Sequence, residues 1–256
     1  MVRPKKHLGQ HFLHDRNIAG RIAMLVPDDA GLVLEIGPGT GVLTQFLLPR
    51  FGSRLRLIEI DGESVAYLKQ HFDLAEGQLL HEDFLVHPLE SFEAEHLVIA
   101  GNFPYNISSQ IFFRILASHR MVSEVVCMIQ LEVAQRIAAP PGSRTYGILS
   151  VLLQAWFDIR LIFEVGPGAF VPPPKVKSAV VHLQRNAVQQ LGCDELLFYK
   201  VVKQAFNQRR KTLRNALSGL VARELEHPLL EKRAEQLAVD DFVRLTSWIE
   251  GINKID

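Results

Sequence analysis

The chain contains few cysteines, no long apolar run and no excess charge of either sign. Its two cysteines, Cys127 and Cys193, have a separation that fits neither a disulfide framework nor a Cys-X-X-Cys redox or zinc motif. Every apolar run is much shorter than the roughly 20 residues that a membrane-spanning helix needs. The first residues lack the apolar centre of a signal peptide. We therefore expect a cytoplasmic globular protein that acts without a membrane.

Charge is balanced overall but unevenly distributed. The sequence has 28 basic and 28 acidic residues, so net charge does not point to a polyanionic partner. A basic stretch over residues 200–214 contains no acidic residue, and its basic members are Lys200, Lys203, Arg209, Arg210, Lys211 and Arg214. Taken alone, this stretch fits either a solvated helix face or a site that binds phosphates.

Short apolar runs alternate with segments of helical spacing through the first part of the chain. The predicted strands are Leu32–Ile36, Leu55–Ile60, Leu79–His81, Leu97–Ala100 and Val125–Ile129. The predicted helices are Gly41–Phe51, Glu63–Phe72, Ser108–Ala117, Leu131–Ala138 and Ile148–Phe157. This alternation is typical of βαβ units around a parallel sheet that is buried on both faces.

The pattern changes towards the end of the chain. Ile159–Val165 and Ser178–Gln184 flank a proline-rich loop, which predicts an antiparallel hairpin at the sheet edge. Four helical patterns follow, at Leu196–Phe206, Arg210–Leu220, Leu229–Gln236 and Val239–Gly251. The fold class is therefore α/β with a small C-terminal α-helical domain. We predict a catalytic domain over residues 1–190 and a helical domain over residues 191–256.

A glycine-rich turn follows the first predicted strand. Gly37, Gly39 and Gly41 alternate with Pro38 and Thr40. Bare backbone at the carboxyl end of a strand lets a ligand approach closely, because a Cβ would hold it away. A dinucleotide site also uses such a turn but needs the spacing G-x-G-x-x-G, and here the third glycine comes one residue early. The spacing therefore argues against a binding site for a nicotinamide dinucleotide but does not exclude one.

Acidic residues follow the next two predicted strands on the side of the glycine turn. Glu59 and Asp61 end the second strand, and Asp83 follows the third. A carboxylate at the end of the second strand can accept hydrogen bonds from both hydroxyls of a ribose, and we assign that role to Glu59. Asp83 could accept a hydrogen bond from an adenine amino group beside the ring of Phe84. Asp61 and Asp83 also fit a structural role as helix or loop caps.

The order E-I-G-P-G-T-G, then E-I-D, then an Asp at a strand end resembles the class I S-adenosylmethionine-dependent methyltransferases. The resemblance implies a Rossmann-like sheet whose glycine loop passes the methionine part of the cofactor and whose second acid holds the ribose. It implies no metal. His7, His11 and His14 could be considered as metal ligands, but neither an acidic nor a thiol partner completes the set.

The fourth predicted strand leads into Asn102-Phe103-Pro104-Tyr105, which we predict to be the target-base site. An adenine amino nitrogen is a poor nucleophile because its lone pair is conjugated with the ring. The Asn102 amide oxygen and the Phe103 carbonyl can accept its N–H groups, with Pro104 fixing the backbone and Tyr105 stacking on the base. Catalysis would then be positioning without a general base. A plain strand-to-helix loop capped by Ser108 is the structural alternative.

This element is similar to the [DNS]-P-P-[FY] motif of amino-methyltransferases. Three further segments narrow the match, namely Gly9–Leu13, Ala169–Val176 and Ala205–Asn215. Together they resemble the small-subunit (16S) ribosomal RNA adenine dimethyltransferases. The resemblance implies methylation of two adjacent adenosines near the 3' end of that RNA, within an immature 30S subunit during ribosome biogenesis. We expect the protein to act as a monomer.

The resemblance also implies roles for individual residues. The implied cofactor contacts are His11, Leu13, Gly37, Gly39, Glu59, Asp83 and Asn102. Phe170 is implied as a second aromatic face beside Tyr105. The implied RNA contacts are Lys203, Arg209, Arg210, Lys211 and Arg214. The sequence departs from the family at His11, where Asn is commoner, and at Phe103, where Leu is commoner.

Two other functions remain open at this point. The large-subunit (23S) RNA adenine methyltransferases that confer macrolide resistance share the glycine loop and the N-x-P-Y element. The proline-rich loop and the basic stretch favour the small-subunit family. A non-catalytic ribosome assembly factor could retain the same fold, although the intact set of Glu59, Asp83, Asn102 and Tyr105 argues against lost chemistry.

Overall fold

A computed structural model describes residues 2–253. Its contacts divide the chain into two compact units. The sheet unit runs up to Ala134 and includes Ile159–Arg185, and the helical unit comprises Gln135–Asp158 and the chain from Asn186 onward. The sequence predicts a single boundary at residue 190. The structure also places the segment Gln135–Asp158 in the helical unit, where α6 (Ile148–Gln154) contacts α7 (Glu195–Asn207) and α9 (Val239–Asn253).

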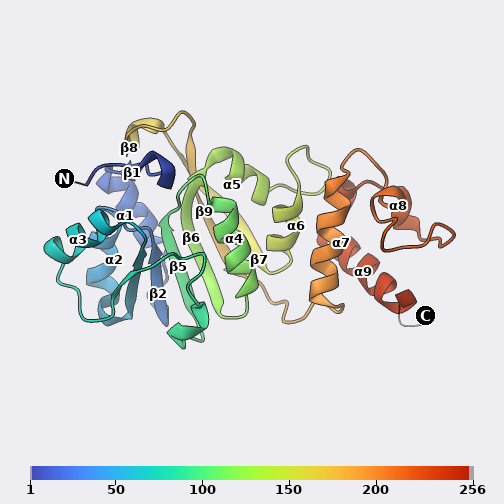
Figure 1. Ribbon diagram of the computed structural model, residues 1–256, viewed down its shortest axis with the longest axis horizontal. Helices are drawn as coiled ribbons and strands as arrows, with labels where there is room; N and C mark the ends of the chain where they lie inside the picture. Colours follow the sequence, from blue (N-terminus) through green and yellow to red (C-terminus); the bar gives the residue numbers. More distant parts are fainter. Residues whose placement is uncertain (1, 254–256) are drawn as a thin grey trace. The chain divides into compact units, whose positions relative to one another are not determined.

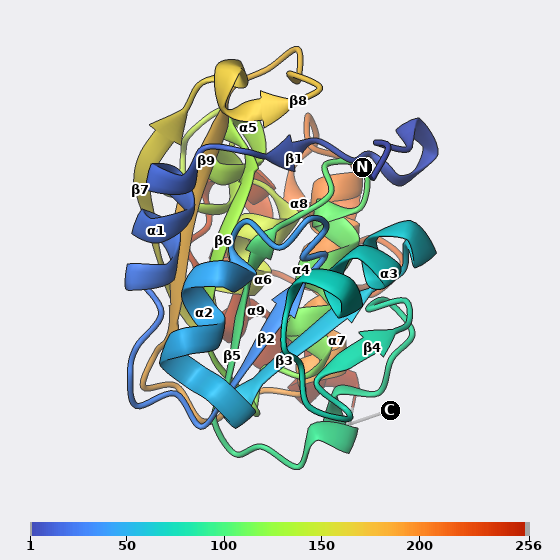
Figure 2. The ribbon, with the colours of Figure 1, turned by 90° about the vertical axis from the view of Figure 1, so that its left-hand side faces the viewer.

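The sheet unit contains a seven-stranded sheet in the order β4-β3-β2-β5-β6-β9-β7. These strands are β2 (Leu32–Ile36), β3 (Leu55–Glu59), β4 (Leu79–His81), β5 (Leu97–Asn102), β6 (Val122–Gln130), β7 (Phe157–Val165) and β9 (Ser178–Arg185). The pairs from β4 to β6 are parallel, whereas β9 runs antiparallel to β6 (Figure 2). The predicted fold class, a mostly parallel α/β sheet with an antiparallel edge, is confirmed.

Helices cover this sheet on both faces. The helices are α1 (Arg16–Met24), α2 (Thr44–Phe51), α3 (Gly62–His71), α4 (Ser108–Ala117) and α5 (Leu131–Ile137). Ile22 of α1 and Leu47 of α2 pack with Val33 and Val98 of the sheet in one buried cluster. Helix α2 begins at Thr44, later than predicted, because Gly37, Gly39 and Gly41 all have positive φ angles. None of the described helices is long and apolar enough to cross a membrane.

A second, two-stranded sheet joins the start of the chain to the proline-rich loop. Strand β1 (Phe12–Leu13) pairs antiparallel with β8 (Phe170–Val171). The pair lies above the carboxyl ends of the main strands in Figure 1. Two-residue strands give no periodic pattern, so neither was predicted. Their pairing brings the segment around His11 beside the end of β5.

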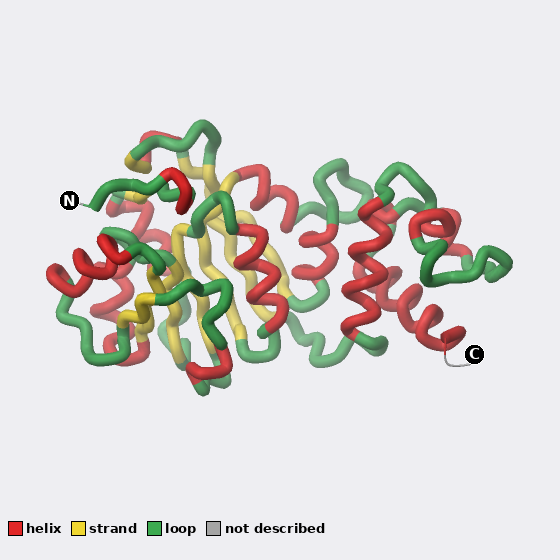
Figure 3. Tube along the Cα trace, viewed as in Figure 1, coloured by secondary structure: helices red, strands yellow, loops and turns green. Residues whose placement is uncertain are grey.

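The helical unit contains α6, α7, α9 and the short α8 (Leu213–Ala216), and a long segment with two 3-10 turns leads from α8 to α9 (Figure 3). The helix predicted over Arg210–Leu220 is therefore largely turn, and the one over Leu229–Gln236 is two 3-10 turns, Pro228–Glu231 and Ala234–Gln236. An antiparallel bridge between Thr212 and Arg233 holds both residues extended, so no helix starts before Leu213 and the second segment is divided at Arg233. A helix cannot pass through residues that pair in this way.

Candidate functional site

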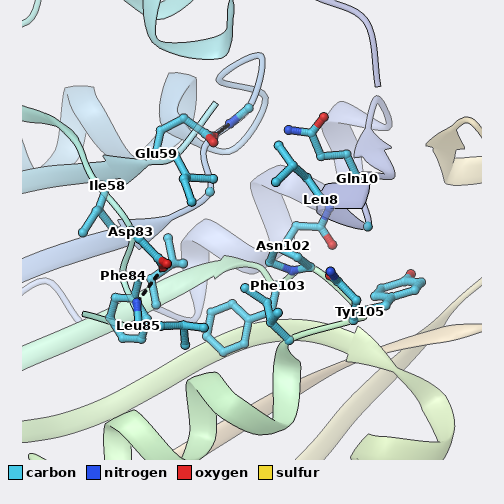
Figure 4. Close-up of a pocket in the computed structure, with 18 of the residues that line it drawn as sticks. Leu8, Gln10, Ile58, Glu59, Asp83, Phe84, Leu85, Asn102, Phe103 and Tyr105 are labelled. Atoms are coloured by element: carbon cyan, nitrogen blue, oxygen red, sulfur yellow. Dashed lines mark hydrogen bonds between the residues drawn. The ribbon is translucent and has the colours of Figure 1, made fainter. Parts of the chain in front are cut away.

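A cavity of about 230 Å³ lies in the sheet unit at the carboxyl ends of β2, β3 and β5. Figure 4 shows Glu59 and Asp83 on one side of it, Leu8 and Gln10 on the other, and Asn102 and Tyr105 along its floor. The predicted site residues that line this cavity are His11, Gly37, Gly39, Glu59, Asp83, Asn102, Phe103, Pro104 and Tyr105. The structure thus gathers residues from distant parts of the chain around one space.

The glycine turn provides a bare backbone wall. Gly37 has a φ of +62°, and a Cβ built there would point into open space with no atom within 4 Å. A side chain at this position would therefore enter the cavity. Gly39 is different, because a Cβ there would lie 2.8 Å from the ring of Phe12. Gly37 is therefore accessible to a ligand, whereas Gly39 is covered by the Phe12 ring.

Glu59 is buried and held by two backbone N–H groups. Its side chain accepts from the N–H of Gly39 at 3.0 Å and from the N–H of Asp61 at 2.9 Å. Burial raises the pKa of Glu59, and these two hydrogen bonds act against that rise. The carboxylate is fixed in orientation, and its remaining lone pairs can accept hydrogen bonds from a diol at the cavity wall.

Asp83 follows β4 and accepts a hydrogen bond from the N–H of Leu85 at 2.9 Å. This bond fixes the turn that carries the side chain, which agrees with the loop-capping role considered for it. One carboxylate oxygen makes that bond, and the group also lines the cavity beside the buried ring of Phe84. Asp83 can therefore cap its own loop and still accept a hydrogen bond from a ligand.

Asn102 is the last residue of β5, and only the nitrogen of its side-chain amide makes a hydrogen bond in the described residues. The side-chain Nδ2 donates to the carbonyl of His11 at 2.9 Å. The Oδ1 atom is buried and has no hydrogen-bond partner in the part of the chain that the structure describes. A buried acceptor without a partner costs about 1–3 kcal/mol, so it needs an explanation such as a functional role or a bound water. Asn102 also lines the cavity, so a small movement of its side chain would offer this acceptor to an N–H donor there.

Tyr105 is fixed at both its hydroxyl and its ring. The hydroxyl forms a hydrogen bond with Ser178 of β9, whose side chain is fully buried. Burial raises the pKa of Tyr105, and this bond acts against the rise. Its ring stacks with His11, with 5.3 Å between ring centres and 29° between planes. His11 in turn donates from Nδ1 to the carbonyl of Pro172 at 2.8 Å.

Phe103 contributes backbone rather than a side-chain surface. Its ring is 1% exposed and packs against Phe112 of α4. Its N–H donates to the carbonyl of Met128 at 3.0 Å, which fixes this residue to β6. The Phe103 ring therefore forms part of the core behind the site, while the residue also lines the cavity.

The structure does not bring Phe170 to the cavity. Phe170 is 2% exposed and lies in the buried cluster with Val165 and Val180. Its strand partner Leu13 is also buried and lines a smaller adjoining cavity that reaches Gly37 and Asn102. The β1–β8 pairing turns Phe170 inward, and the ring found next to Tyr105 is His11.

Sequence reasoning missed an ion pair at the edge of the cavity. The ammonium group of Lys5 contacts the carboxylate of Asp61, which is 2% exposed. Asp61 also accepts from Ser64 at 3.0 Å and caps α3 through the N–H of Glu63. The capping role considered for Asp61 is therefore present. No local pattern links residue 5 to residue 61, so the pair was not visible in the sequence.

The basic stretch belongs to the helical unit, and its members differ in their surroundings. Arg214 is tied to Glu231 at 2.8 Å and donates to the carbonyls of Arg223 and Leu225. Arg209 donates to the carbonyl of Arg144. The side chains of Lys203, Arg209, Arg210 and Lys211 are exposed. Arg214 thus stabilises a loop, whereas the others point charge towards solvent.

No group of three or more His, Cys, Asp or Glu side chains between residues 2 and 253 is placed to hold a metal ion.

Comparison with known proteins places the chain in a family. The family model for ribosomal RNA adenine dimethylase matches residues 1–251. A ribosomal RNA small subunit methyltransferase A from Phocaeicola vulgatus is 49% identical, over 100% of this chain and 94% of the relative. The protein of the same name from Parabacteroides distasonis is 52% identical, over 96% of this chain and 94% of that protein.

Solved structures show the same fold. A dimethyladenosine transferase from Plasmodium falciparum matches with a TM-score of 0.77 and 24% identity, covering 95% of this chain and 98% of that one. The 23S rRNA methyltransferase ErmE matches with a TM-score of 0.65 and 24% identity, covering 92% and 99%. The resemblance predicted from the sequence motifs is confirmed by the family match over nearly the whole chain. The chain belongs to the ribosomal RNA adenine dimethylase family.

Proposed function

We propose that this protein transfers methyl groups from S-adenosylmethionine to the N6 amino groups of two adjacent adenosines near the 3' end of small-subunit (16S) ribosomal RNA. Relatives about half identical over their full length carry the name of small-subunit ribosomal RNA methyltransferases. The observation that carries the chemistry is the Oδ1 of Asn102, a buried acceptor without a partner in the described residues, on a side chain that lines the cavity. An amino group is the donor that such an acceptor needs.

The residues present fit the cofactor. Gly37 offers bare backbone where a Cβ would fill the cavity, and we assign it to the methionine part. Glu59 would hold the ribose hydroxyls, and Asp83 would accept from the adenine amino group. His11 lines the same cavity, and Leu13 lines the smaller adjoining one. When bound, the cofactor supplies an electrophilic methyl group on its sulfonium sulfur.

The target base is held by acceptors and by a ring. Asn102 Oδ1 and the Phe103 carbonyl accept the N–H groups of the adenine and turn the nitrogen lone pair towards the methyl group. Tyr105, fixed by Ser178, supplies the stacking surface. Holding two reactants in line contributes roughly 7–11 kcal/mol when the geometry is good. The proton is lost after the nitrogen has been alkylated, so this chain needs no dedicated base.

The helical unit would hold the RNA. Exposed Lys203, Arg209, Arg210 and Lys211 can contact phosphates, and such contacts offset the few kcal/mol needed to unstack an adenine. Arg214 is assigned to folding of this unit rather than to RNA. The proposal includes action as a monomer in the cytoplasm, on an immature small subunit during ribosome biogenesis. The sheet unit then carries catalysis and the helical unit carries RNA binding.

The test is methyl transfer from labelled S-adenosylmethionine to purified immature small subunits, large subunits and free RNA. We expect transfer to the small subunit, with N6,N6-dimethyladenosine found by mass analysis. Asn102→Ala should lower transfer at least a hundredfold, because the only acceptor aimed at the amine from a side chain is lost. The control is Asn17→Ala, which removes an exposed amide on α1.

The alternatives predict different results. Transfer to the large subunit alone would favour a 23S methyltransferase. Small-subunit binding without transfer would favour an assembly factor. Normal transfer by Asn102→Ala would contradict the mechanism even if the substrate is correct.

A further inference from the structure

The start of the chain crosses the candidate cofactor cavity as a strap, defined here as residues 5–12. Its lining members are His7, Leu8, Gly9, Gln10, His11 and Phe12. In Figure 4, Leu8 and Gln10 face Glu59 and Asp83 across the cavity. The strap therefore forms a wall of the space that the proposed function assigns to the cofactor.

One end of the strap is tied to the acidic end of β3. Lys5 forms an ion pair with buried Asp61 and lies 3.3 Å from Glu63. Gln10 strengthens this end, because its amide oxygen accepts from the Lys5 N–H at 2.8 Å and its nitrogen lies 3.5 Å from Asp61. Asp61 donates its own N–H to Glu59. A single chain of contacts thus runs from the strap to the proposed ribose ligand.

The other end is tied to the target-base site. The carbonyl of His11 accepts from Asn102 Nδ2, which fixes the orientation of the amide and leaves Oδ1 without a partner in the described residues. Gly9 lies against Asn106 so closely that a Cβ would be 2.3 Å from the Asn106 side-chain oxygen. Phe12 covers Gly39 in the same close manner. The position of the strap therefore decides which atom of the Asn102 amide is presented.

We propose that Lys5 is a positioning residue. Its ion pair with Asp61 latches the strap across the cavity, and the latched strap holds the His11 carbonyl that orients Asn102. This inference rests on the proposed function, since it takes the cavity to be the S-adenosylmethionine site. Lys5 touches neither reactant and acts through the strap.

Electrostatics favours this latch over the other contacts of the strap. The Asp61 carboxylate is buried, and charge-assisted hydrogen bonds to a buried carboxylate are about twice as strong as neutral ones. When the latch is lost, the strap samples open states, and the apparent dissociation constant of the cofactor rises in inverse proportion to the closed fraction. A closed fraction near a tenth corresponds to about a tenfold weaker affinity.

The experiment compares Lys5→Met with Lys6→Met in the full chain. Both variants lose one positive charge from the same end of the molecule, but the Lys6 side chain is exposed. Calorimetry with S-adenosylmethionine should give about a tenfold higher dissociation constant for Lys5→Met. Lys6→Met should stay within about twofold of the unchanged protein. Lys5→Arg should restore most of the affinity, because a guanidinium can also pair with Asp61.

Further measurements separate latching from general stability. Lys5→Met should lower the melting temperature more than Lys6→Met, because it leaves the buried Asp61 carboxylate without its cation. A latch further requires that hydrogen exchange quicken in residues 5–12 of Lys5→Met and not in the core strands. Asp61→Asn keeps an N-cap for α3 but removes the ion pair with Lys5. It can therefore replace Lys5→Met in the binding measurement if Lys5→Met folds poorly. Adding Lys5→Met to Asp61→Asn should then weaken cofactor binding no further.

Each outcome decides a different claim. If the unchanged protein binds the cofactor and Lys5→Met and Lys6→Met bind it equally well, the latch is overturned and the proposed function stands. Failure of the unchanged protein to bind S-adenosylmethionine would overturn the proposed function. Additive effects of Lys5→Met and Asp61→Asn would show that the two residues act separately, against the latch.

Discussion

The hydrogen bond between Tyr105 and Ser178 allows stacking by Tyr105 to be separated from any chemical role of its hydroxyl. Ser178 is fully buried, so removing either partner leaves the other without its bond. We expect Ser178→Ala and Tyr105→Phe each to lower the free energy of unfolding by about 1–3 kcal/mol. The double variant should be less destabilised than the sum of the two, by roughly 0.5–1.5 kcal/mol.

Activity should follow the ring and not the hydroxyl. Tyr105→Phe keeps the stacking surface, and its KM for RNA should stay within about threefold of the unchanged protein. Tyr105→Ala loses stacking worth about 1–3 kcal/mol per base, which corresponds to a loss of roughly 5- to 150-fold in kcat/KM. Urea unfolding and steady-state methyl transfer measure the two effects. If Tyr105→Phe lost as much activity as Tyr105→Ala, the hydroxyl would take part in the chemistry and the stacking role would be refuted.

Three further predictions concern buried and exposed charge. Burial raises the pKa of Glu35, beside the cavity, to about 8, with the hydrogen bond from Thr44 acting against the rise. In the unfolded chain this carboxyl ionises near its usual pKa. The contribution of protonated Glu35 to the free energy of unfolding is therefore complete below that usual pKa and is lost as the pH rises through about 8. Glu35→Gln should therefore raise the melting temperature more at pH 8 than at pH 5, and an equal gain at both would contradict the assignment. Neutralising Arg209, Arg210 and Lys211 together should weaken RNA binding and leave cofactor affinity unchanged. The slope of log K for RNA against log salt concentration should become shallower by about two. Arg214→Ala should instead destabilise the helical unit, as thermal unfolding would show, and unchanged RNA binding by the triple variant would refute the phosphate role.

The predictable part of this molecule is the part with local signals. Strands such as Leu32–Ile36 and the helix Ser108–Ala117 have their predicted bounds, because apolar runs and helical spacing are read within a few residues. The glycine turn and the acids that follow β3 and β4 were also located correctly, since the carboxyl ends of parallel strands meet at one edge of a sheet. The helical unit was harder, because a bridge between Thr212 and Arg233 overrides local helical preference at both positions.

Pairing over long distances explains the remaining differences at the site. The β1–β8 pair joins Leu13 to Phe170, which are 157 residues apart in the sequence, and its register sends Phe170 into the core. The same pair carries His11 to the face of Tyr105, where Nδ1 reaches Pro172. The resemblance stated from the sequence implies Asn at position 11, and an Asn side chain has no ring to stack on Tyr105. His11 supplies an aromatic contact at one face of Tyr105, so we expect a target base to meet Tyr105 on its other face or to displace the imidazole.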